Sequence, residues 1–325
     1  LEVKTNIKRN IYNLAGMFSM QTKRAGEVFV LKTIDRAEGV KKLFKHVGLD
    51  EYGGKKVVLK ANYNSADPFP ASTHPDTLRA IVEVLKTAGV EDVTLAERSG
   101  MGVTRRVLEE MGVFELGEKL GFEVVVSDEL GKADWVRIGR EGTHWLRGFC
   151  IAKCFVDADR VVQTCCLKTH RFGGHFTLSL KNSVGAVAKR VPGEVYDYMW
   201  ELHTSPFQRQ MIAEINRHYD VDVVLMDGIR AFVNGGPEHG EVVEPNLMLA
   251  SRDRVAIDAV GVAILRVYGA TGDVGKGKVF ELDQIRRAAE LGIGVGSAKE
   301  IRLKPLNSEC KQDLEKIEQV FATDS

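Results

Sequence analysis

The sequence contains few cysteines, five in 325 residues, at positions 150, 154, 165, 166 and 310. No two of them form a Cys-x-x-Cys pair, which excludes the thioredoxin motif and the cysteine run of ferredoxins. A sparse and odd set in a chain of this size is not typical of a disulfide framework. We therefore expect free, buried thiols and a location in the reducing cytoplasm.

The sequence also lacks an excess of charge of either sign, because 45 Lys and Arg residues match 45 Asp and Glu residues. Without a basic field we expect no nucleic-acid partner. No apolar run approaches the roughly 20 residues that cross a bilayer, so we expect no membrane span. The apolar content of 44% is that of an ordinary globular chain.

Residues 1–25 are basic but contain neither the apolar core nor the cleavage site of a signal peptide. We interpret this segment as an N-terminal arm that docks on the body of the protein or on a neighbouring subunit. A homo-oligomer formed through the arm is one partner interaction that the sequence leaves open.

Short apolar runs alternate with amphipathic stretches along the chain. The expected strands are residues 57–60, 92–97, 123–128, 160–166, 221–227 and 246–251. The expected helices include residues 75–88, 103–120, 206–219 and 253–267. Several strands are apolar on both faces, as in a parallel sheet that is covered by helices.

This alternation predicts an α/β fold, with a mostly parallel or mixed sheet and helices on both of its faces. We see no internal repeat, low-complexity segment or linker. Residues 26–325 are therefore expected to form a single domain, with insertions near residues 129–158 and 188–205.

Basic, hydroxyl and amide side chains gather near the carboxyl ends of two predicted strands, the edge where open α/β sheets bind ligands. Such side chains donate hydrogen bonds and positive charge to carboxylate or phosphate. The predicted ligand-binding residues are Lys60, Asn62, Thr73, Thr169, Thr177, Lys181 and Asn182.

Three residues of the same region are predicted to be catalytic. His170, or alternatively His74, would act as general acid and base, because imidazole titrates near neutral pH. Lys168 stands two residues before His170 and would hold the anion. Thr73 and His74 also precede a helix N-terminus, where free backbone N–H groups favour an anion.

A divalent metal is an alternative occupant, since imidazole and carboxylate suit Zn, Fe or Mn. The candidate ligands are His74, His170, His175, Asp227, Asp253 and Asp258. No His-Glu-x-x-His or comparable close spacing supports them. Asp258 lies in a helix that is apolar nearly all round, where it serves either as a salt bridge or cap, or to orient a lysine or histidine of the pocket.

Two glycine-rich stretches do not identify a cofactor. Residues 272–278 lack the Gly-Lys-Ser/Thr ending of a P-loop, and residues 292–297 follow a helix, the wrong side for a dinucleotide fingerprint. Beyond the open possibility of a divalent metal, the cofactor is therefore unknown. Tyr196, Tyr198 and Trp200 are interpreted as local packing, or alternatively as a lid over the pocket.

At these positions the chain resembles the bacterial and archaeal proteins of the domain of unknown function 362 family (DUF362). The resemblance extends from about Glu27 to Leu303, and its most specific part is the Lys168-Thr169-His170 to Lys181-Asn182 element. It implies a grouping at the level of the fold and a candidate site. Many relatives carry an added ferredoxin-like iron–sulfur module, and this chain lacks the cysteine run of that module.

We therefore predict a protein that binds a small anionic metabolite, a carboxylate or phosphate, at the carboxyl edge of its sheet. Whether it also transforms the metabolite, and hence whether it is an enzyme, stays open. One alternative is a metal-dependent hydrolase or isomerase that uses the His and Asp ligands. Another is a non-enzymatic accessory protein that binds a cofactor or serves a redox partner.

Overall fold

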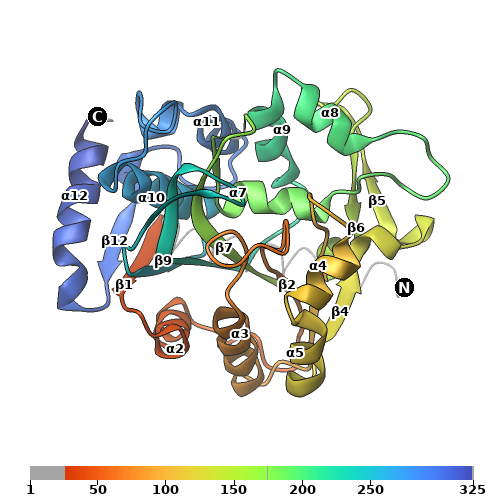
Figure 1. Ribbon diagram of the computed structural model, residues 1–325, viewed down its shortest axis with the longest axis horizontal. Helices are drawn as coiled ribbons and strands as arrows, with labels where there is room; N and C mark the ends of the chain where they lie inside the picture. The colour runs from red at the N-terminus through yellow and green to blue at the C-terminus, as the bar shows by residue number, and fades with distance from the viewer. Residues whose placement is uncertain (1–25, 174, 324–325) are drawn as a thin grey trace, which may run out of the picture.

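The computed structural model describes residues 26–173 and 175–323 of the chain, so the predicted arm, residues 1–25, lies outside the described residues. A ten-stranded sheet forms the centre of the molecule (Figure 1). Its strands are β1 (Glu27–Lys32), β2 (Lys56–Lys60), β3 (Asp92–Glu97), β4 (Glu123–Val126), β7 (Arg160–His170), β8 (His175–Thr177), β9 (Val223–Gly235), β10 (Gly240–Val243), β11 (Leu247–Ser251) and β12 (Arg302–Pro305).

The strands follow the order β12-β1-β11-β9-β7-β2-β3-β4, with β8 paired to β7 and β10 paired to β9. Strands β4, β3, β2, β7 and β9 run parallel to one another. Strand β11 is antiparallel to both β9 and β1, while β12 is parallel to β1. The prediction of a mostly parallel or mixed sheet is confirmed.

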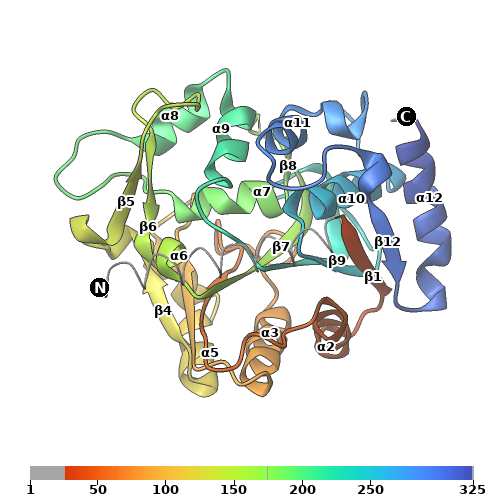
Figure 2. The same cartoon turned by 180° about the vertical axis from the view of Figure 1, so that it is seen from behind.

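Helices cover both faces of this sheet, as the two opposite views show (Figures 1 and 2). On one face lie α2 (Arg36–Val47), α3 (Pro75–Thr87), α4 (Thr104–Glu110) and α5 (Val113–Leu120). On the other lie α7 (Ser179–Asn182), α9 (Gln208–Ile215), α10 (Arg254–Val267) and α11 (Asp283–Glu290). The core is divided accordingly: Leu43 and Ile81 pack on the first face, and Ile257 and Ile285 on the second.

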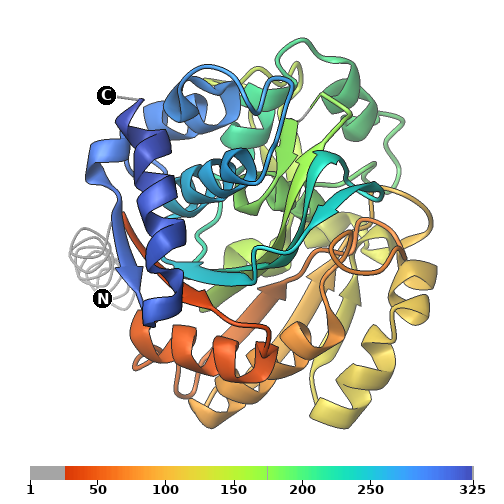
Figure 3. The same ribbon diagram turned by 60° about the vertical axis from the view of Figure 1, so that its left-hand side comes forward.

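Figure 3 brings the β1–β12 side of the sheet forward, with the last helix, α12 (Lys311–Ala322), packed over this edge. At the opposite end, β5 (Trp135–Ile138) and β6 (Phe149–Ala152) form a separate antiparallel pair, followed by α6 (Lys153–Asp157). This pair lies within the segment predicted as an insertion near residues 129–158. The short helix α8 (Tyr198–Thr204) begins inside the other, near residues 188–205.

Local sequence signals explain where several elements begin and end. Pro75 occupies the first turn of α3, where its missing N–H costs nothing. The helix expected at residues 103–120 is two helices instead, because Gly112 adopts a left-handed φ of 68° between α4 and α5. Strand β7 continues to His170, beyond the predicted end at residue 166.

No helix in the described ranges is both long enough and apolar enough to cross a bilayer.

Candidate functional site

The site lies at the topological switch point of the sheet, where the chain stops adding strands on one side and begins adding them on the other. From β2 the chain proceeds to β3 and β4 on one side, and from β7 to β9 on the other, although β2 and β7 are neighbours. In open α/β sheets ligands bind at the carboxyl ends of strands that meet at such a switch point. A cavity of about 500 Å³ opens there.

Seven of the residues predicted from the sequence line this cavity. They are Lys60, Asn62, Lys168, His170, Thr177, Lys181 and Asn182. Glu97, Arg98, Lys189, Met199 and His203 are among the lining residues that the sequence analysis did not assign to the site.

The β7–β8 hairpin aims three of these side chains at the cavity. Lys168 and Thr177 are directly opposite each other in its register. Because side chains alternate along a strand, Lys168 and His170 share one face and Thr169 points to the other. The Thr169 hydroxyl donates to the carbonyl of Phe232 at 3.1 Å, so Thr169 fastens β7 to β9 and does not line the cavity.

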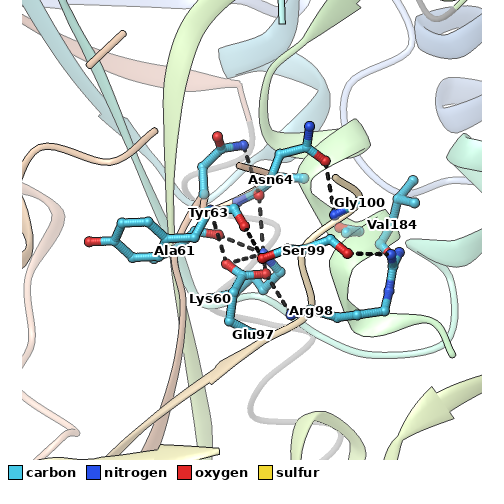
Figure 4. Close-up of polar contacts among 12 residues, drawn as sticks. Lys60, Ala61, Tyr63, Asn64, Glu97, Arg98, Ser99, Gly100 and Val184 are labelled. Atoms are coloured by element: carbon cyan, nitrogen blue, oxygen red, sulfur yellow. Dashed lines mark hydrogen bonds and ion pairs between the residues drawn. The ribbon is translucent and has the colours of Figure 1, made fainter. Parts of the chain in front are cut away.

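A buried ion pair forms the floor between β2 and β3. The Lys60 ammonium lies 2.7 and 2.9 Å from the two oxygens of Glu97 (Figure 4). It also lies 3.2 Å from Oδ1 of Asn182. Glu97 also accepts the backbone N–H of Arg98 at 2.9 Å. Because Glu97 balances the charge of Lys60, this lysine has no unpaired charge for a ligand. Its role is to hold the loops around the cavity in place.

Gly185 is required for this close packing. A Cβ at this position would lie 2.6 Å from Cε of Lys60 and 2.9 Å from Oε1 of Glu97. The 3₁₀ turn η3 (Ser183–Ala186) can therefore approach the ion pair only with glycine there.

Arg98 holds the same turn from the β3 side. Its guanidinium donates to the backbone carbonyls of Val187 at 2.7 Å and Val184 at 2.5 Å (Figure 4 draws the Val184 contact). Its charge is buried, and the described residues offer it no ion pair with a carboxylate. Burial lowers the pKa of Arg98 from its ordinary value.

Lys168 is fully buried and forms no ion pair with any described residue. Its ammonium donates to Oδ1 of Asn62 at 3.0 Å and to the carbonyl of Ala71. These neutral acceptors orient the ammonium group but do not balance its charge. Burial accordingly lowers the pKa of Lys168.

Lys181 has fewer polar partners than the other buried cations that line the cavity. Its side chain lines the wall, the residue is 9% exposed, and its ammonium has no hydrogen-bond or ion-pair partner within residues 26–173 and 175–323. Burial, followed by repulsion from Lys168 and Arg98, lowers the pKa of Lys181 to about 8. A buried cation without an anion is costly, so this position favours an anionic ligand.

Asp258 explains how Lys181 is held. From inside α10, its carboxylate accepts the backbone N–H groups of Ser179 at 2.8 Å and Leu180 at 2.9 Å, at the start of α7. The helix that carries Lys181 and Asn182 is thus anchored to the core. Of the two sequence interpretations, the cap is the one observed: Asp258 acts on Lys181 through the backbone, and burial raises the pKa of Asp258 to about 7.

Two histidines face the cavity with opposite tautomers. His170 accepts the backbone N–H of Phe172 on Nδ1, at 3.2 Å, so the proton of the neutral ring is on Nε2. His203 contacts the carbonyl of Met199 through Nδ1, at 2.6 Å, so Nδ1 carries the proton and Nε2 keeps a lone pair. His170 is thus a donor towards the cavity and His203 an acceptor.

The acid–base role predicted for His170 assumed titration near neutral pH. Burial, together with Lys181, Lys168 and His203, lowers the pKa of His170 well below its ordinary value. A ring that stays neutral at pH 7, with Nδ1 occupied, donates a hydrogen bond from Nε2 and cannot accept a proton there.

The hydroxyl of Thr177 is a further unused donor. Its oxygen is buried and has no hydrogen-bond partner among the described residues. Buried polar groups in native proteins are nearly always paired, so this hydroxyl beside the cavity is available to donate to a ligand atom.

The cavity as a whole is cationic. Lys60, Arg98, Lys168, Lys181 and Lys189 line it, against the carboxylates of Glu97 and Asp197. At its rim, Lys189 pairs with Asp128 at 3.1 Å and Asp197 with Arg190 at 3.0 Å. The cations without a carboxylate partner among the described residues are therefore the buried ones: Arg98, Lys168 and Lys181.

Trp200 is the aromatic residue of the 188–205 segment that reaches the cavity, where it remains 70% exposed. Tyr198 is buried and Tyr196 donates to Glu201 at 2.7 Å, so both pack locally. Of these three aromatic residues, Trp200 is the one whose position fits the lid interpretation.

Two predicted ligand-binding residues and one predicted catalytic residue are not part of the cavity. Thr73 accepts the backbone N–H of Asn62 at 2.9 Å and fixes the loop after β2. His74 caps α3, where its Nδ1 accepts the backbone N–H of Asp76 at 3.1 Å, and it lines a separate hollow with Arg36 and Phe69. Thr169, as described above, points to the opposite face of β7.

The structure does not bring the six predicted metal ligands together. Within residues 26–173 and 175–323, no three His, Cys, Asp or Glu side chains are grouped to hold a metal ion. His175 lies 3.1 Å from Asp273, and Asp227 binds Arg36 at 2.9 Å and Thr77 at 2.6 Å.

Asp253, another of these six residues, caps α10 by accepting the backbone N–H groups of Val255 and Ala256, and Asp258 anchors α7. His74 and His170 lie in different hollows. The carboxylates are thus occupied by backbone or cationic partners.

All five cysteines are free, and Cys150, Cys165, Cys166 and Cys310 are buried. Burial raises the pKa of Cys166 to about 12 and that of Cys165 well above its ordinary value. These thiols are small apolar core residues, as the sequence suggested, and are unsuited to nucleophilic chemistry.

Comparison with known proteins gives a family. Residues 57–263 match the family model described as "Domain of unknown function (DUF362)". The matched range contains all seven predicted residues that line the cavity, and it lies inside the range over which the sequence resembled this family.

Two individual proteins are similar to this chain. A thylakoid-associated protein of a Synechocystis strain is 28% identical over 228 residues, which cover 67% of this chain and 65% of that protein. The chain thus matches slightly less than two thirds of that relative. The cytoplasmic location expected from the cysteines stays a prediction.

The second is a solved structure, the lactate racemase apoprotein of Thermoanaerobacterium thermosaccharolyticum. It is 13% identical, with 91% of each chain covered and a TM-score of 0.42.

Proposed function

Because the chain belongs to the DUF362 family, whose description assigns no activity, we propose its function from the cavity itself: it binds a small carboxylate or phosphate there. One observation carries the proposal. Lys181 is a buried cation that lacks any partner among the described residues, and it faces a cavity that already contains Lys168. An anion would offset the cost of keeping these two charges out of water.

The neutral donors support the same ligand. Among the residues that the structure describes, the hydroxyl of Thr177 has no partner, and His170 presents an Nε2–H. Together with the two ammonium groups they offer four donors to an oxyanion. Charge-assisted hydrogen bonds of this kind are the strong ones in proteins.

Asn62 and Asn182 are positioning residues. Asn62 accepts from Lys168 through Oδ1, at 3.0 Å, and its amide nitrogen lies 3.3 Å from Oδ1 of Asn182. Asn182 in turn accepts from Lys60 at 3.2 Å and donates to the carbonyl of Thr164 at 3.0 Å. This chain of hydrogen bonds fixes Lys168 relative to α7, and therefore relative to Lys181.

The binding proposal is tested by titration calorimetry of the full chain with inorganic phosphate and with malonate, at pH 7 and at pH 9. Loss of one charge-assisted hydrogen bond costs about 1.5–3 kcal/mol, so Lys168→Met and Lys181→Met should each weaken binding by about 10- to 100-fold. Binding to wild type should also be weaker at pH 9, where Lys181 has lost its proton.

Lys42→Met is the matched control, because Lys42 lies on the exposed side of α2, with its ammonium 3.6 Å from Glu38. It should leave the affinity unchanged. If neither anion binds the wild type, or if Lys168→Met and Lys181→Met bind as the wild type does, the cavity is not an anion site.

A further inference from the structure

The cavity contains three buried lysines, and their surroundings divide them into two kinds. Lys60 is paired with Glu97, and Lys168 donates to Asn62 and to the carbonyl of Ala71. Both ammonium groups are held by fixed acceptors. Lys181 has no acceptor in the described part of the chain, so its amine is free of the fixed hydrogen bonds that orient Lys60 and Lys168.

The neighbours of Lys181 also favour its neutral amine. Burial disfavours its charged form, and Lys168 and Arg98 add repulsion, which brings the pKa of Lys181 to about 8. A substantial fraction is then unprotonated in mildly alkaline solution. Desolvated lysines beside a second cation are the ones that act as nucleophiles towards carbonyl compounds.

Donors and an acceptor for such chemistry lie in the same cavity. The hydroxyl of Thr177 and the ammonium of Lys168, which are opposite each other on the hairpin, suit a carboxylate. His170 donates through Nε2, which suits a carbonyl oxygen that gains charge during attack. His203 keeps an Nε2 lone pair that can accept a proton from the amine.

We propose that Lys181 forms an imine with the carbonyl carbon of a small 2-oxo acid whose carboxylate is held by Lys168 and Thr177. The inference rests on the proposed anion site and adds a substrate class and a covalent step to it. The Nζ lone pair forms the C–N bond while the carbonyl π electrons move to oxygen, which takes up a proton. The carbinolamine then releases that oxygen as water.

The step is balanced without any other reactant. Both amine protons leave with the carbonyl oxygen as one molecule of water, and a C=N bond replaces the C=O bond. No atom is oxidised or reduced. His203 can carry a proton from the amine to the departing oxygen, so the residues at the cavity are sufficient.

The test traps the imine by reduction. The full chain is incubated with pyruvate and sodium cyanoborohydride between pH 6.5 and 9.5, digested, and mapped by mass spectrometry. A reduced adduct should appear at Lys181 before any other lysine, with a rate that rises with a midpoint near pH 8. Inorganic phosphate should slow it, and Lys181→Arg should abolish it while Lys42→Arg changes nothing.

Formaldehyde in place of pyruvate separates the parts of the inference, because it reacts with an accessible amine but has no carboxylate. Methylation of Lys181 by formaldehyde without a pyruvate adduct would overturn the 2-oxo acid as the substrate class. Phosphate binding with no labelling of Lys181 by either reagent would overturn the imine and leave the anion site standing. If phosphate itself does not bind, the proposed function fails as well.

Discussion

Lys168 and Thr177 lie directly opposite each other on the β7–β8 hairpin, and both side chains line the cavity. One brings a charge without a carboxylate and the other a hydroxyl without any partner among the described residues. Without a ligand, each of these buried polar groups lowers the free energy of unfolding relative to an apolar side chain of the same shape. This makes the contribution of the site to binding separable from its contribution to stability.

Thr177→Val should show this separation most simply. Removing a buried hydroxyl that has no partner in the described part of the chain should leave stability unchanged or raise it by about 1 kcal/mol, whereas phosphate affinity should fall about 5- to 10-fold. Urea unfolding and calorimetry measure the two effects. Thr73→Val is the contrast, because Thr73 accepts the N–H of Asn62; that variant should lose about 1 kcal/mol of stability.

Lys181→Met should stabilise the empty protein at pH 7. The pKa of Lys181 is lowered in the folded state from 10.5 to about 8, so the folded protein binds fewer protons than the unfolded chain between these values. The stability of the wild type therefore rises with pH across this window, and the cost of the buried charge is fully present below pH 8. The gain for the variant at pH 7 is on the order of 3 kcal/mol.

Urea unfolding of wild type and Lys181→Met at pH 7, 8, 9 and 10 checks this prediction. The difference in free energy of unfolding should shrink as the pH rises. A difference that is constant across these values would mean that the charge of Lys181 does not cause it.

Gly185→Ala should disturb the Lys60–Glu97 ion pair without changing any charge. The new Cβ would lie within 3 Å of both side chains, and overpacking of this kind typically costs about 1–3 kcal/mol. Phosphate affinity should fall as well, because η3 follows directly after Lys181 and Asn182. Gly53→Ala, where a Cβ meets nothing closer than 3.7 Å, should be nearly neutral in both measurements.

Asp258→Asn should change how stability depends on pH. Burial raises the pKa of Asp258 from 3.8 to about 7, so the stabilising contribution is complete below about pH 4 and is lost as the pH rises through 7. Relative to the asparagine variant, the wild type should therefore become progressively less stable between pH 4 and pH 7. Parallel urea titrations in this range would contradict the prediction.

The strand ends explain why much of the site could be predicted from the sequence. Lys60 and Lys168 each follow an apolar run that is buried on both faces, and such runs identify the carboxyl edge of a parallel sheet. Lys181 and Asn182 were found by their residue types and by their nearness to Lys168 in the chain.

The sequence analysis misplaced Thr169 and missed Glu97, and both errors have physical causes. Thr169 was assigned to the site because it is adjacent to Lys168 in the sequence. Strand β7 continues through both residues, however, and side chains alternate between the two faces of a strand. Thr169 therefore points away from the cavity. Glu97 was noted as a strand end and not assigned to the site, although a buried lysine at the neighbouring strand end requires a carboxylate. A search for the counter-ion of Lys60 would have found it.

His203 could not have been identified from its neighbours in the sequence. It lies at the C-terminal end of α8, far along the chain from His170, and the fold alone brings both to one cavity. The tautomers of the two rings are likewise set by backbone atoms, those of Phe172 and Met199, whose positions no residue pattern reveals.

The burial of Cys165 and Cys166 has a practical consequence. Both thiols lie on β7, just before the part of this strand that carries Lys168 and His170, and neither is accessible in the folded protein. An alkylating reagent can reach them only when the sheet opens, so their rate of modification reports global unfolding. A bound anion that stabilises the folded state should slow that rate, which would reveal occupancy through a reagent that never enters the cavity.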